Sequence, residues 1–137
     1  MKTIGKGLVA LAVAVGAGLA ATEAEAQSQL QFSYTQSQDT ETPQSASGGT
    51  GSIEFAGSLT TPTPCYELAG SHAVRGSRVI LTVTATGTGG ICTQVITHNN
   101  YQGQVTGLAA GSYTFEVVHR TGGGRGETVY STQVTVQ

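Results

Sequence analysis

The feature that most constrains the fold is a strict alternation of apolar and polar side chains, which recurs along the chain after residue 27. In residues 113–118, for example, Tyr113, Phe115 and Val117 alternate with Thr114, Glu116 and Val118. Successive side chains of a β-strand point to opposite faces, so this period of two predicts strands with one face on a core. The same rhythm occurs in residues 30–35, 53–59, 66–74, 79–86 and 130–136, and no sustained helical period accompanies it.

Turn-forming residues separate these segments. Pro62 and Pro64 interrupt the chain, Gly76 is the centre of a tight hairpin, and glycine clusters follow at residues 87–90 and 121–127. Several short strands at this spacing predict an all-β fold, a single antiparallel β-sandwich of about seven or eight strands.

The first 26 residues have the pattern of a secretory signal peptide. Lys2 and Lys6 precede an apolar run over residues 8–21, and the small residues Ala24 and Ala26 form a cleavage site before Gln27. The apolar run is too short to span a membrane. We therefore expect a secreted protein, periplasmic or extracellular, whose mature chain is one domain over residues 27–137 with no membrane anchor.

Residues 36–51 differ from the rest of this domain. They contain a single aliphatic side chain, Ala46, among many Ser, Thr, Gln and Gly residues. Such a segment can bury little apolar surface, so the sequence predicts a flexible polar loop or linker that tethers the strand at residues 30–35.

Cys65 and Cys92 are the only two cysteines. In an oxidising compartment an even pair most simply forms one disulfide, which would stabilise the fold by about 3.5 kcal/mol in the chain-entropy model. A metal pair or a redox pair is the alternative, but no C-x-x-C spacing supports either one.

Charge and motif content argue against several functions. Residues 27–137 contain four arginines and six acidic residues, and this weak balance excludes the basic field that nucleic-acid binding needs. The three histidines, His72, His98 and His119, lack metal-ligand spacing, and no nucleophile elbow or phosphate-binding glycine loop occurs. We expect no enzyme, no metal and no cofactor.

Leu108, Gly111 and Tyr113 form an L-x-x-G-x-Y pattern at the head of an alternating strand. This segment resembles the tyrosine corner of immunoglobulin-like and fibronectin type III-like sandwiches. The resemblance implies that the Tyr113 ring enters the core, that its hydroxyl bonds to a nearby backbone group, and that Gly111 lies in the turn. It covers about 13 residues, and it implies an immunoglobulin-like fold but no particular function.

The cysteines depart from the antibody pattern. The chain has no tryptophan, and the strand parity that turns Tyr66 and Leu68 inward turns Cys65 outward. If Ile91 and Val95 also point inward, Cys92 points outward as well. We therefore expect a disulfide at a strand end or on an outer face, and a looser immunoglobulin-like domain of a secreted bacterial protein.

A candidate binding surface follows from counting chain reversals. If residues 98–100 form a tight turn between strands at 91–98 and 101–107, the turns at 75–77, 98–100 and 121–127 lie at one end of the sandwich. Loops gathered at one end commonly bind ligands in this fold. The candidate residues are Arg75, Arg78, His98, Asn99, Asn100, Tyr101, Arg120 and Arg125, and such a set suits an acidic or carbohydrate-like partner. The alternative is that these arginines only solvate hairpin tips.

Three functions remain open at this level. The first is a non-catalytic secreted binding or adhesion module with a protein or glycan ligand. The second is a structural subunit that polymerises when the strand at residues 30–35 completes a neighbour's sheet, so that the protein is either a monomer or a self-polymer. The third is a protease inhibitor that presents residues 60–68 as a proline-braced loop.

Overall fold

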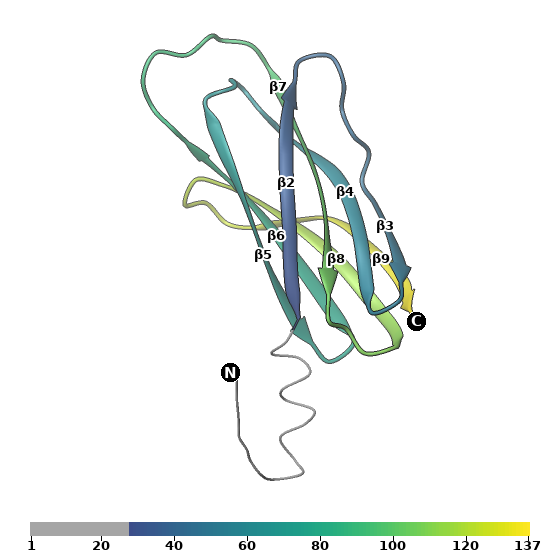
Figure 1. The fold of residues 1–137 in the computed structure, drawn as a ribbon. Coiled ribbons are helices and arrows are strands. Elements are labelled where there is room, and N and C mark those ends of the chain that lie inside the picture. Colours follow the sequence, from purple (N-terminus) through teal and green to yellow (C-terminus); the bar gives the residue numbers. More distant parts are fainter. Residues whose placement is uncertain (1–27) are drawn as a thin grey trace, which may run out of the picture.

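The computed structural model describes residues 28–137, so the predicted signal peptide lies outside the described residues. These residues form eight strands in two facing sheets (Figure 1), which confirms the predicted all-β sandwich. The strands are β2 (Gln29–Ser37), β3 (Ser45–Gly49), β4 (Ser52–Thr61), β5 (Tyr66–Arg75), β6 (Arg78–Gly87), β7 (Thr97–Thr106), β8 (Gly111–Thr121) and β9 (Glu127–Val136). Within this part of the chain, no helix is long and apolar enough to cross a membrane.

The strand order is β2-β7-β4-β3 in one sheet and β5-β6-β8-β9 in the other. Neighbouring strands pair antiparallel, except that β6 and β8 are parallel, with Val79 opposite Phe115. The parallel pair arises because β7, the strand between them in the chain, lies in the other sheet. The chain reverses once to enter β7 and once more to leave it, so β8 runs in the same direction as β6.

The core lies between the sheets and is built from the side chains that alternation predicts to face inward. Val79, Leu81 and Val83 of β6 are fully buried, as are Ile53 of β4 and Phe115 of β8. Aromatic rings pack both between and within the sheets. Phe55 of β4 stacks on Phe115 of the opposite sheet with ring centroids 5.8 Å apart, and Phe32 of β2 stacks on Tyr101 of the neighbouring β7 at 5.6 Å. Close packing of this kind makes a single continuous core.

One glycine is needed for this aromatic packing. Gly103 lies in β7 with its missing side chain directed inward, where a Cβ would approach the Phe55 ring to 2.8 Å and meet the backbone carbonyl of Gln31. No side chain fits there without displacing the neighbouring strand, so the β7 backbone occupies the space instead.

The structure corrects the prediction of a turn at residues 98–100. Thr97–Thr106 is one uninterrupted strand that pairs with β2 on one side and β4 on the other. Asparagine tolerates turn geometry, and for this reason residues 98–100 resemble a tight turn. Here Asn99 is held within the strand by side-chain hydrogen bonds to the backbone carbonyl of Leu59 and the hydroxyl of Thr61.

The predicted loop at residues 36–51 is also shorter than expected. Residues 36 and 37 extend β2, and residues 45–49 form β3, a short edge strand paired with β4. The connection at residues 38–44 is fastened to the outer face of β7 by the Asn100 side chain. Its Oδ1 accepts from the Thr42 amide at 2.9 Å, and its Nδ2 donates to the Thr40 carbonyl at 3.0 Å.

The connections fall at two ends of the sandwich. The registers place residues 50–51, 76–77 and 107–110 at one end, which we call the hairpin end. Residues 38–44, 62–65, 88–96 and 122–126 lie at the other end, which we call the disulfide end.

The tyrosine corner forms at the hairpin end. The buried Tyr113 side chain donates its hydroxyl hydrogen to the Ala109 carbonyl at 2.7 Å, and Gly111, the first residue of β8, has a positive φ of 155°. The hydrogen bond matches the expectation from the L-x-x-G-x-Y pattern, and the glycine lies where the turn passes into the strand. The hydrogen bond fixes the position where the chain crosses from β7 in one sheet to β8 in the other.

Candidate binding end

The connection between β6 and β7, residues 88–96, projects beyond the strands at the upper left of Figure 1. We call it the tip loop. Ile91 is fully exposed on it and Ile96 is 63% exposed. Contiguous exposed apolar surface often marks an interaction site, and both side chains belong to the same nine-residue loop. The tip loop therefore exposes two large aliphatic side chains at the disulfide end.

A disulfide ties the middle of the tip loop to the residue before β5. Cys65, immediately before β5, is bonded to Cys92, and the two Cα atoms lie 6.1 Å apart. The Thr88 amide also donates to the Cys65 carbonyl at 3.0 Å. The predicted pairing and its position at a strand end are thus confirmed. The expected inward position of Ile91 is wrong, because the loop at residues 88–96 is not a strand and Ile91 faces solvent.

A buried polar network supports the loops beneath the tip. Asn99 of β7 is fully buried, and its Oδ1 accepts from Gln36 Nε2 at 3.0 Å. The same Gln36 amide donates to the Pro64 carbonyl at 2.8 Å. Thr61 accepts from Asn99 Nδ2 and passes its own hydrogen to the Thr63 carbonyl at 2.7 Å. Satisfied networks of this kind rigidify their surroundings, so the loop at residues 62–65 has a fixed position beside the disulfide.

The predicted cluster of eight binding residues does not form. Arg75 and Arg78 lie at the hairpin end, because the continuous β7 removes one of the chain reversals on which that cluster depended. Asn99 and Tyr101 are buried inside the sandwich, and Asn100 is occupied with the 38–44 connection. His98 is bonded to Thr60 through its ring nitrogen Nδ1 at 2.9 Å.

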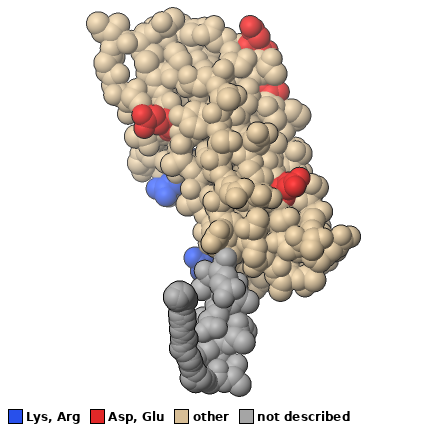
Figure 2. Space-filling model, in the orientation of Figure 1, with Lys and Arg blue, Asp and Glu red and all other residues tan. Residues whose placement is uncertain are grey.

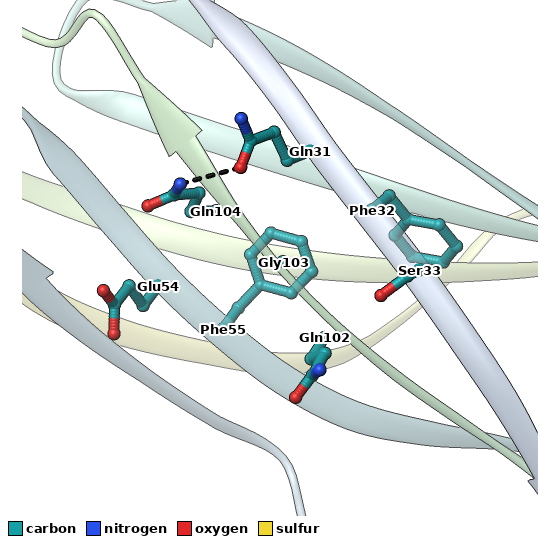
Figure 3. Close-up of a pocket in the computed structure, with 8 residues that line it drawn as sticks. All are labelled: Gln31, Phe32, Ser33, Glu54, Phe55, Gln102, Gly103 and Gln104. Carbon is teal, nitrogen blue, oxygen red and sulfur yellow. Dashed lines mark hydrogen bonds between the residues drawn. The ribbon is translucent and has the colours of Figure 1, made fainter.

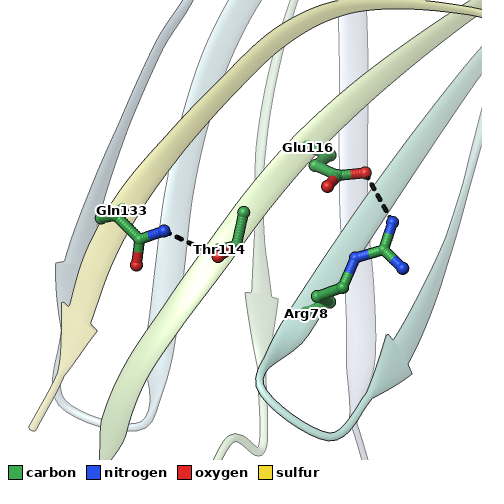
Figure 4. A network of polar contacts seen from close by, with 4 residues as sticks. All are labelled: Arg78, Thr114, Glu116 and Gln133. Atoms are coloured by element: carbon green, nitrogen blue, oxygen red, sulfur yellow. Dashed lines mark hydrogen bonds and ion pairs between the residues drawn. The ribbon is translucent and has the colours of Figure 1, made fainter.

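Arg78 is committed to a local ion pair. Its guanidinium lies 2.9 Å from the Glu116 carboxylate on the outer face of β6 and β8, and Gln133 bonds to Thr114 beside it (Figure 4). Exposed pairs of this type contribute little to stability. The pair does, however, satisfy the charge of Arg78. This supports the alternative that the arginines at hairpin tips only solvate them.

Only Arg120 and Arg125 of the predicted arginines lie at the disulfide end. Arg120 donates through Nε to the Gly124 carbonyl at 3.2 Å and so braces the connection at residues 122–126. The tip loop itself has no charged side chain. In the view of Figure 2, isolated acidic and basic groups lie on a surface that is otherwise uncharged, and the projecting part at the upper left carries none.

A shallow hollow of about 470 Å³ lies on the outer face of β2, β7 and β4. Amide and hydroxyl side chains surround it, and Gln104 donates to Gln31 across its rim at 2.8 Å (Figure 3). Glu54 is the only charged side chain in its lining, which is otherwise made of Gln31, Phe32, Ser33, Phe55, Gln102, Gly103 and Gln104. The hollow can offer hydrogen bonds to a neutral polar group, but it lacks an exposed aromatic or aliphatic anchor.

One buried pair of titratable groups lies between the sheets. The Tyr101 hydroxyl lies 2.7 Å from His119 Nε2 and 3.1 Å from Gln44 Oε1. An amide oxygen can only accept, so the tyrosine donates to Gln44 and accepts from a histidine protonated at Nε2. Burial raises the pKa of Tyr101 to about 12. Burial also lowers the pKa of His119, against the opposing charge of Glu127. Both groups are therefore neutral near pH 7.

Sequence reasoning missed the two tip isoleucines. A signal was available, because Ile91 and Ile96 have opposite parity and cannot face the same side of one strand. Glycines at 89 and 90, both with positive φ, further separate this segment from the strand before it.

Among residues 28–137, no group of three or more His, Cys, Asp or Glu side chains could hold a metal ion. The model of one protein family, the ORF11 β-sandwich domain, matches residues 58–136, which include the tip loop and both cysteines. Curated proteins and solved structures give no match. The chain belongs to the ORF11 β-sandwich domain family.

Proposed function

We propose that this protein is a secreted, non-catalytic binding module that holds a protein partner through the tip loop at its disulfide end. The observation that carries the proposal is the exposure of Ile91 and Ile96 on a loop held by the Cys65–Cys92 disulfide. Apolar anchors that enter a pocket of the partner supply most of the affinity in protein interfaces.

The contacts that fix the tip loop favour binding. A loop that is already fixed loses little conformational entropy when it meets a partner, so more of the contact energy appears as affinity. The disulfide fixes one point of the tip loop, and the Thr97 hydroxyl fixes another by donating to the Val95 carbonyl at 3.0 Å. The neutral tip also suits an apolar partner surface better than the acidic ligand expected from the arginines.

The tyrosine corner supports a relationship to immunoglobulin-like and fibronectin type III-like domains of bacterial secreted proteins. The parallel pairing of β6 with β8 departs from the antiparallel sheets of that class. The proposed binding role rests on the sandwich and its loops. It does not depend on a relationship to immunoglobulin-like or fibronectin type III-like domains.

The experiment compares capture of partners by the wild-type protein and by the double variant Ile91→Ser/Ile96→Ser. Each protein is immobilised, exposed to the surface and secreted proteins of the producing cells, and the retained proteins are identified by mass spectrometry. Burial of one isoleucine contributes about 1.5–3 kcal/mol. Loss of both should weaken binding by roughly a hundredfold or more, and the specific partner should disappear from the retained set.

Val129→Ser is the matched control. Val129 is also partly exposed, at 39%, but it lies on the outer face of β9 and not on the tip loop. This variant should retain the partner as the wild type does, and all three proteins should unfold at similar temperatures. Equal retention by the double variant, or no specific retention by the wild type, would contradict the proposal.

A further inference from the structure

The edge of the sandwich at β2 has the properties of a strand that pairs with another chain. Gln29–Ser37 is nine residues long and contains no charged residue, proline or glycine. Edge strands expose unpaired backbone groups, and proteins usually protect them with charges, prolines, bulges or short length. Among the described residues, the backbone of β2 pairs with β7 alone, so its other side is open.

The other three edge strands are better protected. β5 carries Glu67 near one end and Arg75 at the other. β3 has only five residues, and it packs so closely on β9 that a Cβ at Gly48 would collide with the Thr135 carbonyl. The register of β9 with β8 is also shifted between Val117 and Val118. β2 is therefore the one long edge in the described fold without such a device.

The β2 sequence is complementary to itself. In an antiparallel pair centred on Ser33, Phe32 lies opposite Tyr34 of the partner subunit, and Gln31 lies opposite the partner's Thr35. Phe32 and Tyr34 are only half-buried in the single chain, although both pack on the core. Pairing would bury more of both rings, and directly opposed aromatic pairs stabilise sheets. With no charge on the strand, self-pairing creates no repulsion.

From these observations we infer that β2 is a self-association edge, along which two copies of this chain pair antiparallel to form one continuous eight-stranded sheet. Each copy keeps its own β2 paired with its own β7. Because the two strands run in opposite directions, the disulfide ends of the two copies point away from each other.

The test is sedimentation of the full chain, processed as the producing cell processes it, over a range of concentrations. The wild type should show a reversible monomer–dimer equilibrium. Ser33→Lys places two lysines directly opposite each other at the two-fold axis, and should weaken association by roughly fivefold or more. Ser33 is exposed, so the single chain should tolerate the change.

Ser131→Lys is the matched control, since Ser131 is exposed on another edge strand, β9. It should leave association unchanged. A wild type that stays monomeric, or a Ser33→Lys protein that associates as the wild type does, would overturn the inference. The second outcome would also be expected if β2 were exchanged between copies, because an exchanged strand occupies the same site in the partner's sheet.

A cysteine variant tests the register. Opposed residues in an antiparallel pair have Cα atoms about 4.5–5.5 Å apart, which lies within disulfide range. Ser33→Cys should therefore form a covalent dimer on oxidation. Thr35→Cys should not, because it faces Gln31 of the partner subunit. Equal cross-linking of the two variants would exclude the proposed register.

Discussion

At the scale of single residues, Tyr113 links the L-x-x-G-x-Y pattern to the fold most directly. Its hydroxyl satisfies the Ala109 carbonyl at the crossing between the sheets. Tyr113→Phe removes this bond while keeping the ring, and should lower the free energy of unfolding by about 1 kcal/mol in a denaturant titration. Tyr130→Phe is the control, since Tyr130 also packs on the core but makes no hydrogen bond through its hydroxyl within residues 28–137. An equal loss in both variants would mean that the corner bond has no special role.

His119 makes stability depend on pH. Burial lowers its pKa below the usual value in the folded state, so the unfolded chain takes up a proton first as the pH falls. The free energy of unfolding should therefore be unaffected by this group well above its ordinary pKa of about 6.5, and should decrease as the pH falls through that value. The measurement is denaturant unfolding from pH 8 to pH 5 for the wild type and for His119→Gln, which can still donate to Tyr101. The free energy of unfolding of the variant should decrease less over this pH range than that of the wild type. An identical pH dependence in the two proteins would contradict the assignment of this decrease to His119.

At the scale of strands, the sequence was sufficient to identify a strand whose inner face is apolar. It was insufficient where the inner face is polar. The alternation of β6 and β8 identified both strands and their buried residues, because Val, Leu and Phe fill their inner positions. β7 begins instead with Thr97 and Asn99 facing inward, and both are buried. The Asn99 side chain can be buried because it bonds to residues of β2 and β4, which lie far away in the sequence. No local pattern reveals these partners, so the segment resembled a turn.

β3 was missed for a related reason. Its five residues are Ser, Ala and Gly, which have little tendency to form strands. The strand exists because β4 offers an open edge beside it and β9 packs against Gly48. Tertiary contacts, rather than local preference, decide such a strand.

At the scale of the whole molecule, the number of chain reversals decides which loops meet. The sequence predicted the sandwich, the disulfide and the tyrosine corner, but one false turn placed Arg75 and Arg78 at the wrong end. The disulfide end combines the Cys65–Cys92 bond, a satisfied polar network and two exposed isoleucines on an uncharged loop. Two exposed isoleucines above fixed loops are the arrangement that the proposed binding role requires.

Photo-cross-linking from the tip loop is the most direct test of whether this loop binds a partner. A photoactivatable amino acid replaces Ile91 in one protein and Val129 in another, and each protein is irradiated in the presence of the producing cells' surface and secreted proteins. We expect a discrete adduct with one partner from position 91 and none from position 129. Adducts from position 129 alone, or no adduct from position 91, would contradict the claim that the tip loop binds a partner.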